Sequence, residues 1–90
     1  MEISNFTASH DDKIQDSITS ILKELSKAER KHPNWPKDII HQAAVVAEES
    51  GELTRASLQF VYEDGAIQNL RTEAIQTAAM AIRFLINLPA

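Results

Sequence analysis

The chain has no cysteine, only two glycines, three prolines and one tryptophan among its 90 residues. Without cysteine it cannot form disulfide bonds or thiolate metal sites, so any metal ion must be bound by oxygen or nitrogen. Two glycines are too few for a glycine-rich phosphate-binding loop. No run approaches the roughly 18 apolar residues of a membrane span, and the first residues lack the basic and apolar regions of a signal peptide. We therefore expect a cytoplasmic protein that does not enter membranes.

Basic residues are in the minority: nine lysines and arginines stand against 13 aspartates and glutamates, for a net charge of −4. An acidic balance argues against broad nucleic-acid binding, so no nucleic-acid partner is expected. The length is that of one domain, and we assign residues 1–90 to a single all-α domain. A chain this short buries only about 60–65% of its unfolded surface, which favours oligomerisation as a source of further stability.

Apolar residues at spacings of three and four predict an all-α protein with three helices. We place the helices at about residues 11–31, 36–62 and 66–88, after an irregular arm at residues 1–10. Two apolar residues of the arm, Ile3 and Phe6, are candidates for docking on the helical body.

Polar and conformationally special residues mark the predicted helix ends. Thr7 or Ser9 is the expected cap of the first helix. Asn34 is the expected cap of the second helix, with Pro36 in its first turn. Gly65 is predicted to end the second helix in the left-handed conformation. The short connection that follows predicts an antiparallel hairpin of the second and third helices.

The second and third helices are apolar on more than one side, so three helices alone cannot cover them. The second helix carries Ile40, Ala43, Ala47, Leu58 and Val61 on the side away from Glu49, and we expect it to be the central, most buried element. Small residues of the third helix permit close approach of its neighbours: Ala74, Ala78, Ala79 and Ala81. A second subunit would complete a four-helix core, as a homodimer or homotetramer.

Carboxylates interrupt the apolar faces of both hairpin helices. Glu49 shares its face with Leu53, and Glu52 follows one turn later. Glu73 and Gln76 repeat this i, i+3 offset on the third helix. A carboxylate within an apolar stripe costs free energy unless it is compensated, so we expect a cation or a metal ion beside it.

The predicted hairpin brings the two polar pairs level to within one or two helical turns. Three carboxylates and an amide oxygen that converge would suit a hard divalent cation, Mg²⁺ or Mn²⁺, which keeps several waters and binds substrate phosphates. The alternative is that these residues are solvated helix charges. That alternative is the better explanation for Glu48, which points away from the apolar stripe.

The segment Ala47-Glu48-Glu49-Ser50-Gly51-Glu52-Leu53, followed by Glu73-Ala74-Ile75-Gln76, resembles the paired motifs of the all-α NTP pyrophosphatases, the MazG-like superfamily. That family pairs EExxE on one helix with ExxD on the next, and the resemblance covers about residues 33–88. It implies Mg²⁺-dependent hydrolysis of a nucleoside triphosphate, or a related nucleotide, to the monophosphate and pyrophosphate.

Carried over by position, the resemblance implies that Glu49, Glu52, Glu73 and Gln76 are metal ligands and that Glu48 or Glu49 is the catalytic base. Gln76 stands where the family has aspartate. An amide ligates through its oxygen, but it brings no charge and cannot act as a base.

For the substrate itself, Arg83, Lys37 and Arg55 are the cations expected to meet phosphate oxygens, and Trp35 is the candidate to stack on a base. The alternatives are a surface charge at Arg83 and a packing anchor at Trp35. Two other functions stay open at this point. One is a non-catalytic helical oligomeric binding or assembly module that kept the fold but lost turnover at Gln76, and the other is a structural coiled-coil adaptor.

Overall fold

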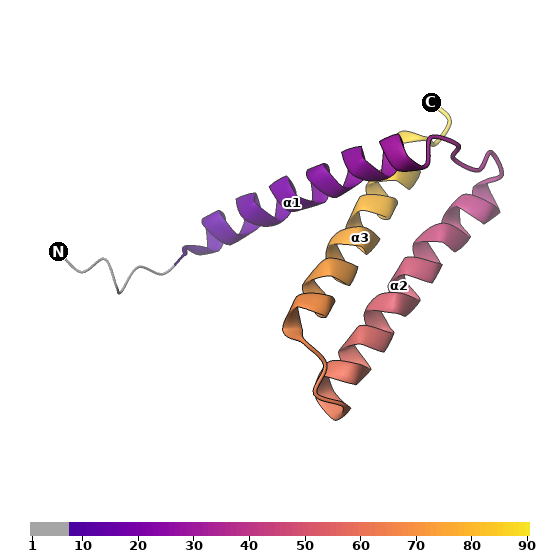
Figure 1. Cartoon of the computed structure of the whole chain (residues 1–90). Helices are drawn as coiled ribbons and strands as arrows, with labels where there is room; N and C mark the ends of the chain where they lie inside the picture. The colour runs from indigo at the N-terminus through magenta and orange to yellow at the C-terminus, as the bar shows by residue number, and fades with distance from the viewer. Residues whose placement is uncertain (1–7) are drawn as a thin grey trace.

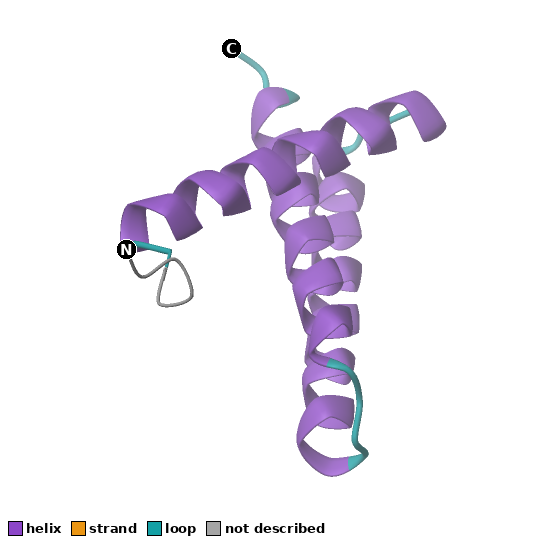
Figure 2. Cartoon of the chain, turned by 60° about the vertical axis from the view of Figure 1, so that its left-hand side comes forward, coloured by secondary structure: helices purple, strands orange, loops and turns teal. Residues whose placement is uncertain are grey.

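The computed structural model describes residues 8–90, which form three helices and no strand (Figure 1). α1 spans His10–Lys31, α2 spans Ile39–Tyr62 and α3 spans Ile67–Ile86. α2 and α3 lie side by side as an antiparallel hairpin, and α1 crosses its open end and projects beyond it (Figures 1 and 2). The all-α prediction and the hairpin are confirmed. No helix within residues 8–90 has both the length and the apolar character needed to cross a bilayer.

A capping box starts α1. The Ser9 hydroxyl accepts a hydrogen bond from the Asp12 backbone N–H (3.1 Å), and the Asp12 carboxylate accepts one from the Ser9 backbone N–H (3.3 Å). Ser9 is therefore the cap, one of the two residues predicted. The other candidate, Thr7, lies outside the described residues, as do Ile3 and Phe6 and most of the predicted arm.

The start of α2 differs from the prediction. The helix begins at Ile39 and is capped by Asp38, whose carboxylate accepts a hydrogen bond from the His41 backbone N–H at 2.9 Å. Asn34 is not the cap, and Pro36 precedes the helix instead of lying in its first turn. The Pro36 carbonyl instead accepts a hydrogen bond from Gln42 Nε2 at 2.7 Å. This side-chain contact, which no local rule predicts, ties the loop to the first turn of α2.

The turn after α2 also differs. Asp64, with a φ of 55°, takes the left-handed conformation that was predicted for Gly65. Glycine is needed at position 65 for a different reason, because a Cβ there would lie 2.9 Å from the backbone carbon of Gln59. The Gly65 backbone N–H donates to the Gln59 carbonyl at 2.9 Å, and this close approach leaves no room for a side chain. At the other end of α3, the helix stops at Ile86, two residues before the predicted end.

α3, and not α2, is the central helix, because it packs against both of the others. Its buried residues are Ala79, Met80 and Arg83, and Ala79 is fully buried. Ala79 and Met80 form the main apolar cluster with Leu25 of α1, and Trp35 packs against that cluster. The prediction that α2 would be most buried was wrong because α1 crosses over α3 and leaves the far side of α2 uncovered.

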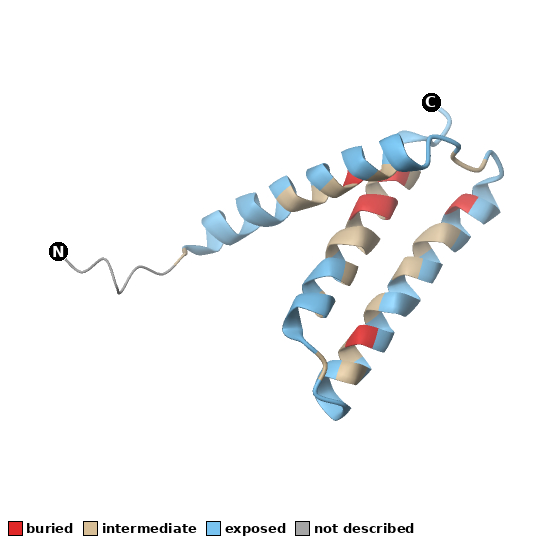
Figure 3. Ribbon diagram, viewed as in Figure 1, coloured by how far each residue is buried: buried red, intermediate tan, exposed pale blue. Residues whose placement is uncertain are grey.

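The apolar core of the single chain is small. Only Leu25, Ala56, Ala79 and Met80 are buried apolar residues among residues 8–90. Figure 3 shows that buried positions cluster where α1 crosses α3, and that most of α1 and the distal end of the hairpin are exposed. Ile40 and Val61 of α2 are 76% and 66% exposed. Large apolar surfaces therefore remain in contact with solvent.

Arg83 ties the loop between α1 and α2 to α3. Its side chain is only 5% exposed, its Nη2 donates to the His32 carbonyl at 2.7 Å, and its guanidinium carbon lies 4.7 Å from the centre of the Trp35 ring. Both contacts are made by a planar, permanently charged group that suits stacking and carbonyl binding together. Two buried side-chain atoms, Trp35 Nε1 and Gln42 Oε1, have no hydrogen-bond partner within the described residues.

Replacing Arg83 with alanine removes the ring contact and leaves the His32 carbonyl without its donor. We expect Arg83→Ala to lower the free energy of unfolding by about 2–4 kcal/mol. Urea unfolding followed by circular dichroism, at one fixed protein concentration, measures this change. Arg71→Ala, at an exposed position of the same helix, is the matched control and should change stability by less than about 0.5 kcal/mol. Equal effects of the two substitutions would contradict the structural role of Arg83.

Candidate functional site

A cavity of about 450 Å³ lies where the three helices and the loop after α1 meet. This volume lies within the range of small-molecule sites. Its lining comes from all three helices and the loop. α1 contributes Glu24, Lys27, Ala28 and Lys31, and the loop contributes Trp35 and Pro36. The hairpin contributes Val45 and Glu49 from α2, and Gln76, Met80 and Arg83 from α3. The cavity therefore combines an apolar floor with acidic, amide and basic groups.

Glu49 is the acidic centre of this cavity. Its pKa is raised above the ordinary value of 4.5, first by partial burial and then by the negative charges of Glu73, Glu48, Glu52 and Glu24. The hairpin supplies the contribution of Glu73, and the crossing of α1 supplies that of Glu24. Carboxylates from all three helices thus act on one point, which is favourable for binding a cation.

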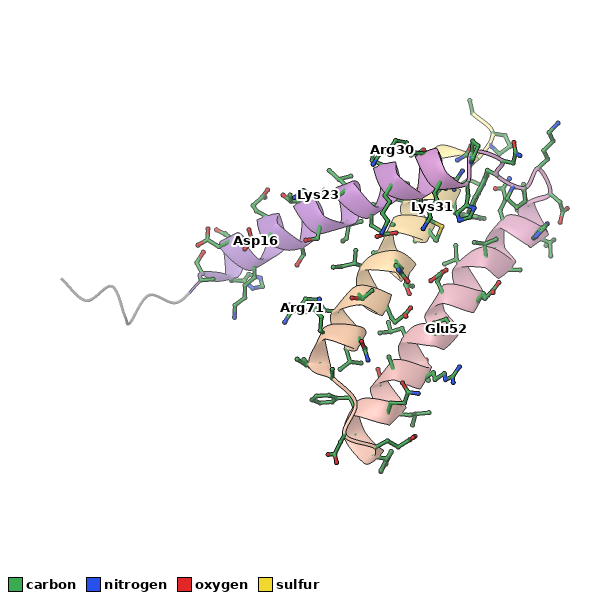
Figure 4. The ribbon with its side chains drawn as sticks, viewed as in Figure 1. Asp16, Lys23, Arg30, Lys31, Glu52 and Arg71 are labelled. Carbon is green, nitrogen blue, oxygen red and sulfur yellow. The ribbon has the colours of Figure 1, made fainter. Side chains whose placement is uncertain are left out.

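The predicted metal ligands are only partly assembled. Glu49, Glu73 and Gln76 are half-buried, whereas Glu52 is exposed on α2 (Figure 4). Within residues 8–90, no three acidic or histidine side chains lie close enough together to hold a metal ion. The donor chemistry, carboxylates with one amide oxygen, suits a hard divalent cation. In this structure the side chains do not close around one.

Two of the predicted substrate-binding residues have structural contacts. Arg83 lines the cavity, but its head group is engaged by the His32 carbonyl and the Trp35 ring. Trp35 is half-buried, covered by Arg83 and packed against the core cluster. In these contacts Trp35 packs against the core, and Arg83 covers its ring. The roles of Arg83 in phosphate binding and of Trp35 in base stacking remain predictions.

The other predicted residues lie away from this cavity. Lys37 and Arg55 are exposed and do not line it, and the same holds for Glu48, although the charge of Glu48 reaches Glu49. A larger hollow of about 780 Å³ between the first half of α1 and the hairpin is lined by Leu53, Leu70 and Ile75, among others, and lacks Glu49 and Gln76. Two predicted metal ligands, Glu52 and Glu73, line neither hollow. We therefore place the candidate site in the smaller cavity, which Glu49 and Gln76 line.

Sequence reasoning missed the contribution of α1. Glu24, Lys27 and Lys31 line the cavity at i, i+3 and i+7, which places them on one face of the helix. This spacing was visible in the sequence, but nothing in it showed that this polar face would turn towards Glu49. Only the crossing of α1 over the open end of the hairpin brings the two together.

No family model matches the chain, and comparisons with curated proteins and with solved structures give no match.

The raised pKa of Glu49 predicts how stability depends on pH. The Glu49 carboxyl binds its proton more tightly in the folded chain than in the unfolded chain. This tighter binding favours the folded state below about pH 4.5, and the advantage is lost as the pH rises through the folded-state pKa. We expect Glu49→Gln to raise the free energy of unfolding at pH 7, with a chelator present, and to flatten the decline of stability above pH 4.5.

Urea unfolding at several pH values measures both effects. The control is Glu63→Gln, which removes one negative charge from an exposed position at the end of α2. It should change stability by less than about 0.5 kcal/mol. A loss of stability at pH 7 in Glu49→Gln would show that the Glu49 carboxylate is stabilised by the fold, contrary to the repulsion described above.

Proposed function

We propose that the chain is a Mg²⁺-dependent nucleotide pyrophosphohydrolase, which cleaves an NTP-like nucleotide to the monophosphate and pyrophosphate. The observation that supports this proposal is the composition of the 450 Å³ cavity. Glu49 of α2 lines this cavity, and Lys27 and Lys31 of α1 form its basic wall. A ligand that carries both a bound cation and several negative charges matches both kinds of group, and a metal-chelated polyphosphate has this character.

Glu49, Glu52, Glu73 and Gln76 are the donors proposed for the cation, and of these Glu49 and Gln76 line the cavity. A divalent cation bound there supplies charge neutralisation at the phosphates and lowers the pKa of an attacking water. The same binding would relieve the like-charge repulsion that adds to partial burial in raising the pKa of Glu49.

In the proposed reaction, the oxygen of a water molecule forms a bond with the α-phosphorus. The bond between that phosphorus and the oxygen bridging to the β-phosphate breaks, and pyrophosphate leaves with the bond's electron pair. The proton of the water passes to a carboxylate, for which Glu49 and Glu48 are the candidates. Glu49 lines the cavity, and Glu48 is next to it on the exposed side of α2.

A second candidate function is a non-catalytic binding module of the same fold. Gln76, which lines the cavity, carries an amide where the resemblance leads one to expect a carboxylate. One negative charge fewer weakens the hold on a divalent cation. The protein would then bind nucleotides or partners without turnover.

We further propose that two or four copies associate, because the far side of α2 is uncovered. Ile40, Leu58 and Val61 on that side are 76%, 53% and 66% exposed. Covering these side chains with a second hairpin would complete a four-helix core and add apolar burial that the single chain lacks. The small core of four buried apolar residues among residues 8–90 supports this association.

The enzymatic proposal is tested by incubating the purified protein with Mg²⁺ and a panel of canonical and modified NTPs, and by measuring pyrophosphate release. We expect turnover that requires Mg²⁺ or Mn²⁺ and that falls about 100-fold or more in Glu49→Gln. Gln76→Asp is expected to lower the Mg²⁺ concentration needed for half-maximal activity. If the wild-type chain turns over no nucleotide while Gln76→Asp does, the binding-module function is the correct one.

Association is tested by sedimentation equilibrium, which should give the mass of two or four chains. Leu58→Glu would place a charge in the proposed interface and is expected to weaken association by roughly 2–4 kcal/mol. Gln68→Glu, an exposed polar position of α3, adds the same charge elsewhere and is the control. A wild-type protein that remains a folded monomer at high concentration would contradict the proposed four-helix core.

A further inference from the structure

The basic wall of the cavity comes from the last two turns of α1. Lys27 and Lys31 are four residues apart and line the same cavity as Glu49 and Gln76. Figure 4 shows Lys31 on the side of α1 that faces α2, whereas Arg30 lies on the outer side. The two lysines are exposed, so their ammonium groups are accessible to a ligand that enters the cavity.

The helix dipole does not account for both lysines. Favourable interaction of cations with a helix C-terminus is confined to about the last turn, which in α1 contains Arg30 and Lys31. Lys27 lies before that turn. Arg30, which is in the last turn but outside the cavity, donates from Nη1 to the Ser26 hydroxyl at 2.8 Å. The difference between these two lysines and Arg30 is therefore that the lysines line the cavity, and not their distance from the end of the helix.

The third cation of the cavity is already engaged. The guanidinium of Arg83 is buried, donates to the His32 carbonyl and covers the Trp35 ring. Moving it onto a ligand would break both contacts and release the loop. Among the lysines and arginines lining this cavity, Lys27 and Lys31 are exposed, whereas Arg83 is buried.

We infer that Lys27 and Lys31 form a phosphate-binding pair that holds the pyrophosphate portion of the ligand, opposite Glu49 of α2. This inference rests on the proposed function for its nucleotide ligand. Two ammonium groups one helical turn apart suit two adjacent phosphates, each of which accepts charge-assisted hydrogen bonds. As the substrate is cleaved, the same pair would stabilise the negative charge that develops on the leaving pyrophosphate.

The inference is tested by isothermal titration calorimetry of the full chain with inorganic pyrophosphate and, separately, with adenosine monophosphate, in the presence of Mg²⁺. We expect each of Lys27→Gln and Lys31→Gln to weaken pyrophosphate binding about tenfold, and the double variant more. Binding of the monophosphate should weaken much less. Lys27→Arg and Lys31→Arg should retain pyrophosphate binding, since the charge is kept.

Arg30→Gln is the matched control, since it removes a cation of the same helix turn that does not line the cavity. It should leave pyrophosphate binding unchanged. Glutamine has nearly the helix propensity of lysine, so circular dichroism should confirm that all variants keep their helices. Unchanged pyrophosphate binding in the double variant, or equal weakening by Arg30→Gln, would overturn the inference. So would a wild-type chain that does not bind pyrophosphate.

The outcomes separate this inference from the proposed function. If the wild-type chain hydrolyses no nucleotide but binds pyrophosphate through the two lysines, the enzymatic proposal falls and the inference stands. If the wild-type chain hydrolyses a nucleotide and the double variant does so with unchanged kcat and KM, the enzymatic proposal stands and the inference falls.

Discussion

The contact of Arg83 with the loop after α1 is the constraint on which the arrangement of the molecule depends. It joins α3 to a carbonyl 51 residues earlier in the chain and covers the Trp35 ring with the same guanidinium. Because the His32 carbonyl directly follows the last residue of α1, the contact anchors the end of that helix above α3. The position of α1 then determines which of its faces lines the cavity, and thereby places Glu24, Lys27 and Lys31 opposite Glu49.

The acidic cluster lowers the stability of the folded chain, and packing does not explain its presence. Glu49 is surrounded by the charges of Glu73, Glu48, Glu52 and Glu24, and burial adds to the penalty on its charged form. A chain with so small a core has little stability to spare. A cation bound as proposed would reduce this repulsion. Under that proposal, the carboxylates that hold the cation are also those whose repulsion lowers the stability of the folded chain.

Local rules predicted the helices and the hairpin correctly, and they failed where distant groups compete for the backbone. Ser9 caps α1 through a box that involves only its own first turn, so the sequence pattern was sufficient. At the start of α2, Gln42 donates a hydrogen bond to the Pro36 carbonyl, and the cap is Asp38 instead of the predicted Asn34. At the following turn, Asp64 took the positive φ and Gly65 was needed for a close backbone approach. These choices depend on contacts that a helical pattern does not contain.

From the sequence by itself, the all-α class, the three helices and the pairing of Glu49 with Glu73 across a hairpin were determined, since periodicity and a short connection are local properties. The tertiary structure alone decided that α3 is central, that Arg83 is a buried clamp and that α1 supplies the basic wall of the cavity. The physical reason is that a helical pattern specifies which side chains share a face. It does not specify which neighbour that face meets, because the crossing of α1 is set by long-range packing and by one side-chain contact in the loop.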